Sequence, residues 1–94
     1  MAVRSVLLAV TLVAAGTLPA LAQDEFKALP PGEGRDVTIK VCSQCHSPEV
    51  VAQQQLDIAG WKQIVDTMAN NGANATDAEF DQIVKYLATA FPAN

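Results

Sequence analysis

The stretch VCSQCH, residues 41–46, contains both cysteines and the single histidine of this 94-residue chain. Cys42 and Cys45 are three residues apart, so on a helical turn their side chains lie on the same side of the backbone. His46 follows Cys45 directly. This grouping indicates one binding centre, and the rest of the fold is expected to form around it.

The pattern C-x-x-C-H is the attachment signature of c-type haem. At this spacing both thiols can reach the two vinyl groups on one edge of a porphyrin, and the imidazole of His46 can reach the iron as proximal ligand. We therefore expect one covalently attached haem c. A thioredoxin-like dithiol would need a βαβ pattern, a structural zinc site would need four ligands, and a plain disulfide would leave His46 unexplained.

The first 22 residues, MAVRSVLLAVTLVAAGTLPALA, resemble a secretory signal peptide. Arg4 is followed by an apolar run over residues 6–15 and by a cleavage site at Ala20-Leu21-Ala22. A retained membrane anchor is the rival interpretation, but the run is shorter than the roughly 20 residues that span a bilayer. Export fits haem attachment, because c-type maturation in bacteria takes place outside the cytoplasmic membrane. We therefore expect cleavage after Ala22 and a periplasmic protein.

The remaining chain, residues 23–94, has five basic and ten acidic residues, a net charge near −5. This charge argues against nucleic acid or an anionic membrane surface as a partner. A chain this short has a marginal core unless a disulfide, a metal or another embedded group supplements it. A bound porphyrin would supply the missing apolar surface.

Helical signals follow one another along this chain. Residues 23–33 are polar and rich in proline, which predicts an extended tether. A helix is expected from Gly34 to Val41, and Ser47-Pro48-Glu49 predicts a cap and a short helix to about Gln55. We expect an all-α domain over residues 34–94, with about four short helices and no strands.

Two amphipathic stripes predict the longer helices. The first helix is expected to end at Gly72, and the second to begin at the capping box Thr76-Asp77-Ala78-Glu79 and stop at Pro92. The first stripe consists of Ile58, Trp61, Val65 and Met68, and the second of Phe80, Ile83, Val84, Leu87 and Phe91.

Met68 is the candidate sixth ligand of the iron, because it is the only thioether left once Met1 is removed. A methionine on an apolar stripe can equally be core filler, which would leave the sixth position vacant, water-bound or filled by a partner. Trp61 is expected either at the haem edge or as an ordinary core aromatic. Asp66, Asp77 and Asp81 are interpreted as solvated helix positions.

These residues resemble a small class I cytochrome c of a bacterial periplasm. In that family a glycine on the N-terminal helix meets an aromatic on the C-terminal helix, and here Gly34 and Tyr86 take these places. Thr38 stands where an aromatic is common, so we expect a looser crossing. The family's proline support for the proximal histidine is not identifiable, which leaves the hydrogen-bond acceptor of His46 unassigned.

A narrower resemblance is to the cytochrome subunits of bacterial sulfite dehydrogenases and to related haem domains of quinohaemoprotein dehydrogenases. It covers Gly34 to Phe91 and implies that Met68 is the axial ligand. The matching positions are Trp61, Met68, Gly72-Ala73, Glu79 and Tyr86-Leu87.

The resemblance implies an electron carrier and not an enzyme. It would shuttle one electron between a dehydrogenase and a downstream acceptor, either as a free protein or as the dehydrogenase's own cytochrome subunit. The alternative is a haem enzyme or gas sensor with an open sixth position. A peroxidase-like role would need a distal His or Arg, and the chain has no second histidine.

Overall fold

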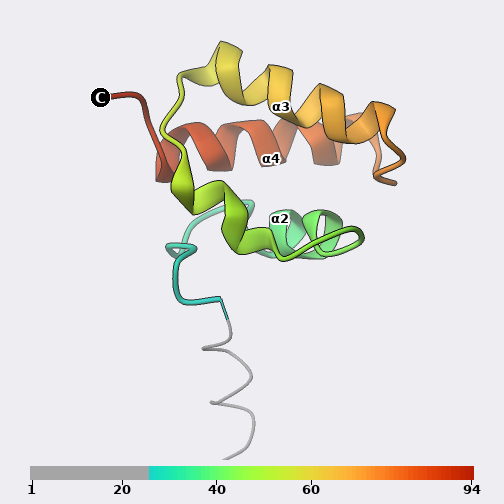
Figure 1. The fold of residues 1–94 in the computed structure, drawn as a ribbon, viewed down its shortest axis with the longest axis horizontal. Coiled ribbons are helices and arrows are strands. Elements are labelled where there is room, and N and C mark those ends of the chain that lie inside the picture. The colour runs from blue at the N-terminus through green and yellow to red at the C-terminus, as the bar shows by residue number, and fades with distance from the viewer. Residues whose placement is uncertain (1–25) are drawn as a thin grey trace, which may run out of the picture.

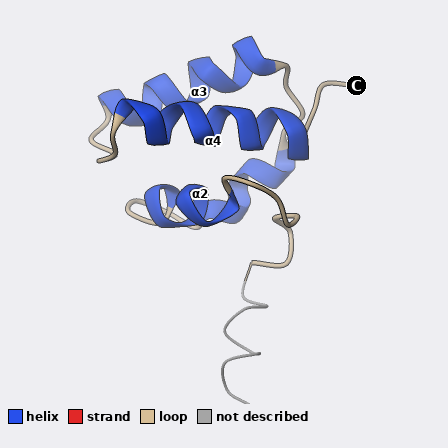
Figure 2. Ribbon diagram, turned by 180° about the vertical axis from the view of Figure 1, so that it is seen from behind, coloured by secondary structure: helices blue, strands red, loops and turns tan. Residues whose placement is uncertain are grey.

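The computed structural model describes residues 26–94. This part contains the α-helices α2 (Arg35–Cys42), α3 (Ile58–Asn70) and α4 (Asp77–Ala90), and the 3-10 helix η1 (Pro48–Gln53). It has no strand, so the predicted all-α class is confirmed (Figures 1 and 2). The predicted signal peptide, residues 1–22, lies outside the described residues. None of the helices in residues 26–94 combines the length and the apolar character needed to cross a membrane.

Helix α4 is the central element of the arrangement. It runs antiparallel to α3 on one side and packs against α2 on the other, while η1 packs against α2 (Figure 1). The turn at residues 71–76 joins α3 to α4 and brings the end of α3 beside the start of α4. The loop that follows α2 lies near this same turn, so residues 42–46 face the α3–α4 corner.

The helix ends follow the predicted capping signals. The Ser47 hydroxyl accepts a hydrogen bond from the Glu49 N–H, and Thr76 and Glu79 form the complete capping box at the start of α4. Gly72 follows α3 with a φ of 110°, a left-handed conformation that glycine adopts without steric cost. The helix after Ser47 is a 3-10 helix that stops at Gln53, two residues before the predicted end.

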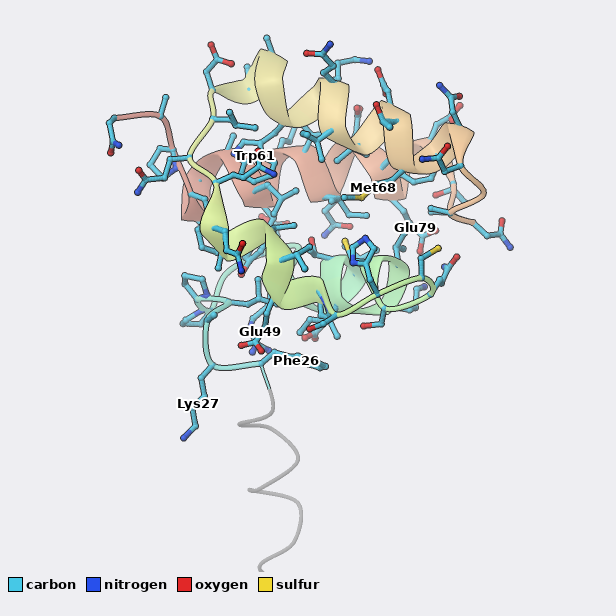
Figure 3. All side chains as sticks on the ribbon, in the orientation of Figure 1. Phe26, Lys27, Glu49, Trp61, Met68 and Glu79 are labelled. Atoms are coloured by element: carbon cyan, nitrogen blue, oxygen red, sulfur yellow. The ribbon has the colours of Figure 1, made fainter. Side chains whose placement is uncertain are left out.

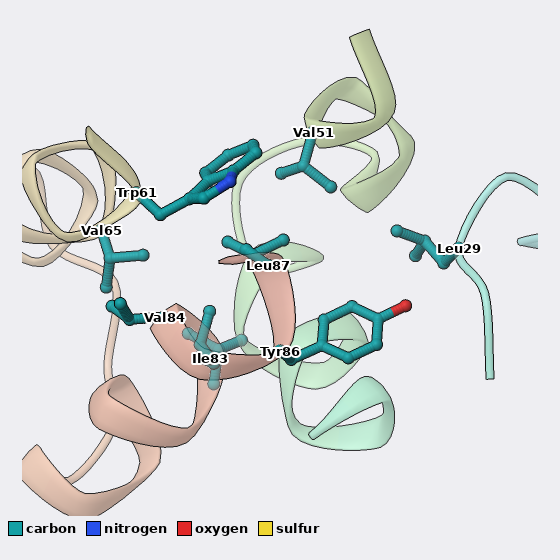
Figure 4. Close-up of a cluster of buried hydrophobic side chains, with 9 residues drawn as sticks. Leu29, Val51, Trp61, Val65, Ile83, Val84, Tyr86 and Leu87 are labelled. Atoms are coloured by element: carbon teal, nitrogen blue, oxygen red, sulfur yellow. The ribbon is translucent and has the colours of Figure 1, made fainter. Parts of the chain in front are cut away.

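The hydrophobic core consists of side chains from α2, α3, α4, η1 and the segment before α2 (Figure 4). Trp61 and Val65 of the first predicted stripe are buried and Met68 is half-buried, but Ile58 is 56% exposed, so the apolar stripe is not covered at this end of the helix. Ile58 is the first residue of α3, and side chains on a helix lean toward its N-terminus, so this side chain extends past the packed part of the helix. The core consists of Leu29, Val41, Val51, Trp61, Val65, Ile83, Val84, Tyr86 and Leu87.

Gly34, the residue that precedes α2, lies close to α4. A Cβ at this position would lie 2.8 Å from the Cβ of Tyr86 and 3.0 Å from the carbonyl oxygen of Gln82. Its φ of 95° also favours glycine. The predicted contact between Gly34 and Tyr86 is therefore confirmed. Thr38, where an aromatic is common in the family, is fully buried, and its hydroxyl has no hydrogen-bond partner among the described residues. The expected looser packing of the crossing stays a prediction.

Residues 26–33 differ from the predicted tether. They form turns without a helix or strand, as expected, but they pack on the domain, and Leu29 is only 2% exposed. The Arg35 guanidinium donates to the carbonyl oxygens of Leu29 and Phe26, at 2.9 and 3.0 Å. The Tyr86 hydroxyl donates to the Pro30 carbonyl at 2.6 Å. The Ala28 N–H also donates to the Glu49 carboxylate at 3.1 Å. Burial of Leu29 and these hydrogen bonds stabilise the packed arrangement.

Candidate functional site

All four predicted site residues line one hollow. Its volume is about 110 Å³, and it lies between residues 41–46, the second half of α3 and the first half of α4. It is lined by Val41, Cys42, Cys45, His46, Val65, Met68, Asn71, Ala73, Phe80 and Ile83. The fold therefore brings residues from three separate parts of the sequence to a single place.

The two cysteines sit at the end of α2 and just beyond it. The Cys42 carbonyl accepts hydrogen bonds from the backbone N–H groups of Cys45 and His46, at 3.4 and 3.5 Å, which continues the helical turn through the motif. Both thiols are free, so the structure contains no Cys42–Cys45 disulfide. Cys42 is buried and Cys45 is exposed, and burial raises the pKa of the Cys42 thiol.

The imidazole of His46 is exposed at the edge of the hollow. Its Nδ1 lies 3.0 Å from the carbonyl oxygen of Ser47. A proton on Nδ1 would be donated to this carbonyl, leaving the Nε2 lone pair free to bind a metal. The Ser47 carbonyl is thus the acceptor that sequence reasoning left unassigned. Its signal is weak in the sequence because the acceptor is a backbone group, which any residue could supply.

Met68 enters the hollow from α3. Its side chain points from that helix toward the α2 side of the domain (Figure 3). Two hydrogen bonds fix the backbone at this residue: the Met68 carbonyl accepts from the N–H groups of Asn71 and Ala73, at 3.1 and 3.0 Å. The hollow therefore contains a thioether from α3 and an imidazole from the loop after α2.

Trp61 does not line the hollow. It is fully buried, its indole N–H donates to the Phe91 carbonyl at 3.0 Å, and its ring centroid lies 6.4 Å from that of Phe91. Of the two interpretations of Trp61, the structure supports the ordinary core aromatic. The carboxylates of Asp66, Asp77 and Asp81 are exposed, as predicted.

The lining of the hollow fits part of a covalently held porphyrin. Apart from the two thiols, the imidazole, the thioether and Asn71, every lining side chain is a hydrocarbon, which suits a flat apolar ring. At about 110 Å³ the hollow is smaller than the 300–1,000 Å³ typical of ligand pockets, so it would enclose only part of a ring as large as a porphyrin. Among residues 26–94, His, Cys, Asp and Glu form no group of three or more that could hold a metal ion.

Two contacts that the sequence did not reveal connect the motif to the α3–α4 corner. The Gln44 carboxamide donates to the Asn74 carbonyl and accepts from the Asn74 N–H, each at 2.9 Å. Lys40 forms an ion pair with Glu79 at 3.0 Å. The partners are 30 residues apart in the first contact and 39 in the second, so neither contact leaves a local pattern in the sequence. Only the opposite charges of Lys40 and Glu79 could have suggested the second contact.

The site thus combines the donors that the sequence predicted with supports that it did not. Its two thiols, its imidazole and its thioether come from residues 42–46 and from α3. Comparison of the chain with protein-family models, with characterised proteins and with solved structures finds no match.

Proposed function

We propose that this chain is a periplasmic single-haem electron-transfer protein with a small class I cytochrome c fold. The observation that carries the proposal is the hollow itself, where both cysteines of the C-x-x-C-H motif, His46 and Met68 meet on an apolar lining. The close contact of Gly34 with Tyr86 supports the fold assignment. Export by residues 1–22 remains part of the proposal.

The residues have distinct roles in this proposal. Cys42 and Cys45 hold one haem c through thioether bonds, His46 is the proximal ligand through Nε2, and Met68 is the sixth ligand through its sulfur. When bound, the haem supplies the exchange of one electron between its ferric and ferrous states. Met68 favours the ferrous state, because its soft sulfur raises the potential. The Ser47 carbonyl orients the His46 ring by accepting from Nδ1.

The proposed partners are a dehydrogenase that supplies the electron and a downstream acceptor that takes it. The protein acts either as a free carrier or as the dehydrogenase's cytochrome subunit, and it is not itself an enzyme. Cys45 and His46 are exposed, so a partner can approach this edge of the hollow. The net negative charge favours a partner with a basic or neutral docking rim and a small, transient interface.

Intact mass and the ferric spectrum of the exported protein test the proposal. The mass should exceed that of the bare chain by one haem, and the spectrum should show the weak far-red band of sulfur-to-iron charge transfer. Met68→Ala should abolish this band. Asn71→Ala is the matched control, because it alters another residue of the lining and should leave the band in place.

Two results would overturn the proposal in different ways. A bare-chain mass would remove haem attachment and every role assigned above. A haem-loaded protein that lacks the band and binds carbon monoxide rapidly when reduced would instead have an open sixth position. That outcome would favour the haem enzyme or gas sensor over the electron carrier.

A further inference from the structure

The two residues proposed as iron ligands lie on elements that do not pack extensively on each other. His46 follows α2, Met68 belongs to α3, and both helices pack mainly against α4. Their separation is therefore set through α4 and through any direct link between the loop after α2 and the end of α3. The bridge between Gln44 and Asn74 is such a link.

We infer that Gln44 is a positioning residue that keeps Met68 in place as the sixth ligand; this inference rests on the proposed function. The carboxamide of Gln44 forms hydrogen bonds with both backbone groups of Asn74, so the motif loop is bound to the main chain of the turn after α3. Because both hydrogen bonds are 2.9 Å long and point in opposite senses, sliding of the turn along the motif loop would break both of them.

Two backbone hydrogen bonds connect this turn to Met68. The N–H groups of Asn71 and Ala73 both donate to the Met68 carbonyl, at 3.1 and 3.0 Å. Ala73 is the neighbour of Asn74, so the bridged residue is one peptide unit away from a direct hydrogen bond to the ligand residue. Movement of Asn74 away from the motif would pull on the last turn of α3, from which the thioether enters the hollow.

The ion pair of Lys40 with Glu79 is a weaker candidate for the same role. It joins α2 to the first turn of α4 and does not touch the turn that follows Met68. The Lys40 side chain and the Gln44–Asn74 bridge are both exposed, so position and not burial separates the two contacts, and only the bridge reaches the turn after Met68. Ser43, the other variable residue of the motif, is exposed, and its side chain makes no hydrogen bond within residues 26–94, so it provides a matched control.

Competition by imidazole on the ferric holoprotein tests the inference. Added imidazole must displace Met68 to bind the iron, and loss of the far-red band reports this displacement. In Gln44→Ala we expect the apparent affinity for imidazole to rise about fivefold to tenfold, because two hydrogen bonds of modest net strength are lost. Gln44→Glu keeps the bond from the Asn74 N–H but loses the donor to its carbonyl, so its affinity should lie in between. Ser43→Ala should match the wild type.

A double-mutant cycle separates positioning from a general loosening of the fold. In a Met68→Ala background imidazole displaces no thioether, so adding Gln44→Ala should leave its affinity unchanged within about twofold. An equal rise in both backgrounds would overturn the inference, because Gln44 would then control access and not Met68. If Gln44→Ala binds imidazole with the same affinity as the wild type, the inference is also overturned. The proposed function would still stand in that case, provided that the wild type shows the far-red band. A wild type without the band would overturn both.

Discussion

Replacement of Gly34 by alanine tests how tightly α2 crosses α4. The added methyl group would lie 2.8 Å from the Tyr86 Cβ and 3.0 Å from the Gln82 carbonyl oxygen, closer than these atoms can approach without movement. Its backbone would also have to keep a φ of 95°. The two helices would therefore have to separate, or α2 would have to begin with a different geometry.

Two costs make up the expected loss of stability in Gly34→Ala. The left-handed backbone conformation costs an L-residue about 1–2 kcal/mol. Overpacking of a close contact costs about 1–3 kcal/mol more. The free energy of unfolding should therefore fall by about 2–5 kcal/mol, a large part of the 5–15 kcal/mol typical of a folded domain.

Gly72→Ala provides the control that separates these two costs. Gly72 has a φ of 110°, but a Cβ added there would meet no atom within 4 Å, so this variant carries the backbone cost alone. Both glycine-to-alanine changes lower the conformational entropy of the unfolded chain by the same amount, so this stabilising effect cancels in the comparison. The difference between the two variants, about 1–3 kcal/mol, is the cost of crowding at the crossing.

Thermal unfolding of the two variants, followed by circular dichroism at 222 nm, measures this difference. In a domain of this size 1 kcal/mol shifts the Tm by about 4–8 °C, so Gly34→Ala should melt at least about 4 °C below Gly72→Ala. Equal Tm values for the two variants would refute the reasoning. The close approach of Gly34 to α4 would then contribute nothing to stability.

Three further predictions concern single side chains. Thr38→Val should raise the free energy of unfolding by about 1 kcal/mol in urea titrations, because it replaces a buried hydroxyl without a partner by a methyl group of similar shape; a loss would mean that the hydroxyl is satisfied. Tyr86→Phe should cost about 1 kcal/mol at neutral pH through the lost bond to Pro30. Burial raises the pKa of Tyr86, so as the pH rises the phenol ionises in the unfolded chain before it ionises in the folded one. The stability of the wild type should therefore fall above about pH 10, and Tyr86→Phe should show a smaller fall in the same titration. Ile58→Ser should change the free energy of unfolding by less than about 0.5 kcal/mol, because the side chain is exposed. Leu87→Ala, at a fully buried position, should lower it by about 2–5 kcal/mol. A large loss of thermal stability in Ile58→Ser would mean that this side chain is packed against the domain.

The helices and their ends could be predicted from the sequence because their signals are local. Ser47, Gly72 and the capping box of Thr76 and Glu79 each act on backbone groups within a few residues, so short motifs identify them. The periodic stripe failed at Ile58, where the helix begins and one face is no longer covered. Periodicity indicates which face is apolar but not how far along the helix a neighbour reaches.

The candidate site likewise has local features that the sequence predicts and long-range contacts that it does not. Cys42, Cys45 and His46 form a contiguous motif, and Met68 was singled out as the remaining thioether. The structure brings these four residues to one hollow, and their roles as haem ligands stay a prediction. The bridge from Gln44 to Asn74 depends on two backbone groups 30 residues away, for which residue type carries no information. Residue type and spacing could therefore point to the candidate donors, but they could not reveal the backbone contact that connects them.

The packing of residues 26–33 moves the start of the independently folding unit toward the N-terminus. A fragment that began at Gly34 would keep every helix described here, yet it would lose the Leu29 side chain from the core and leave Arg35 and Tyr86 without their carbonyl acceptors. Recombinant versions of the domain should therefore begin no later than Phe26, because the segment directly before α2 covers part of the core.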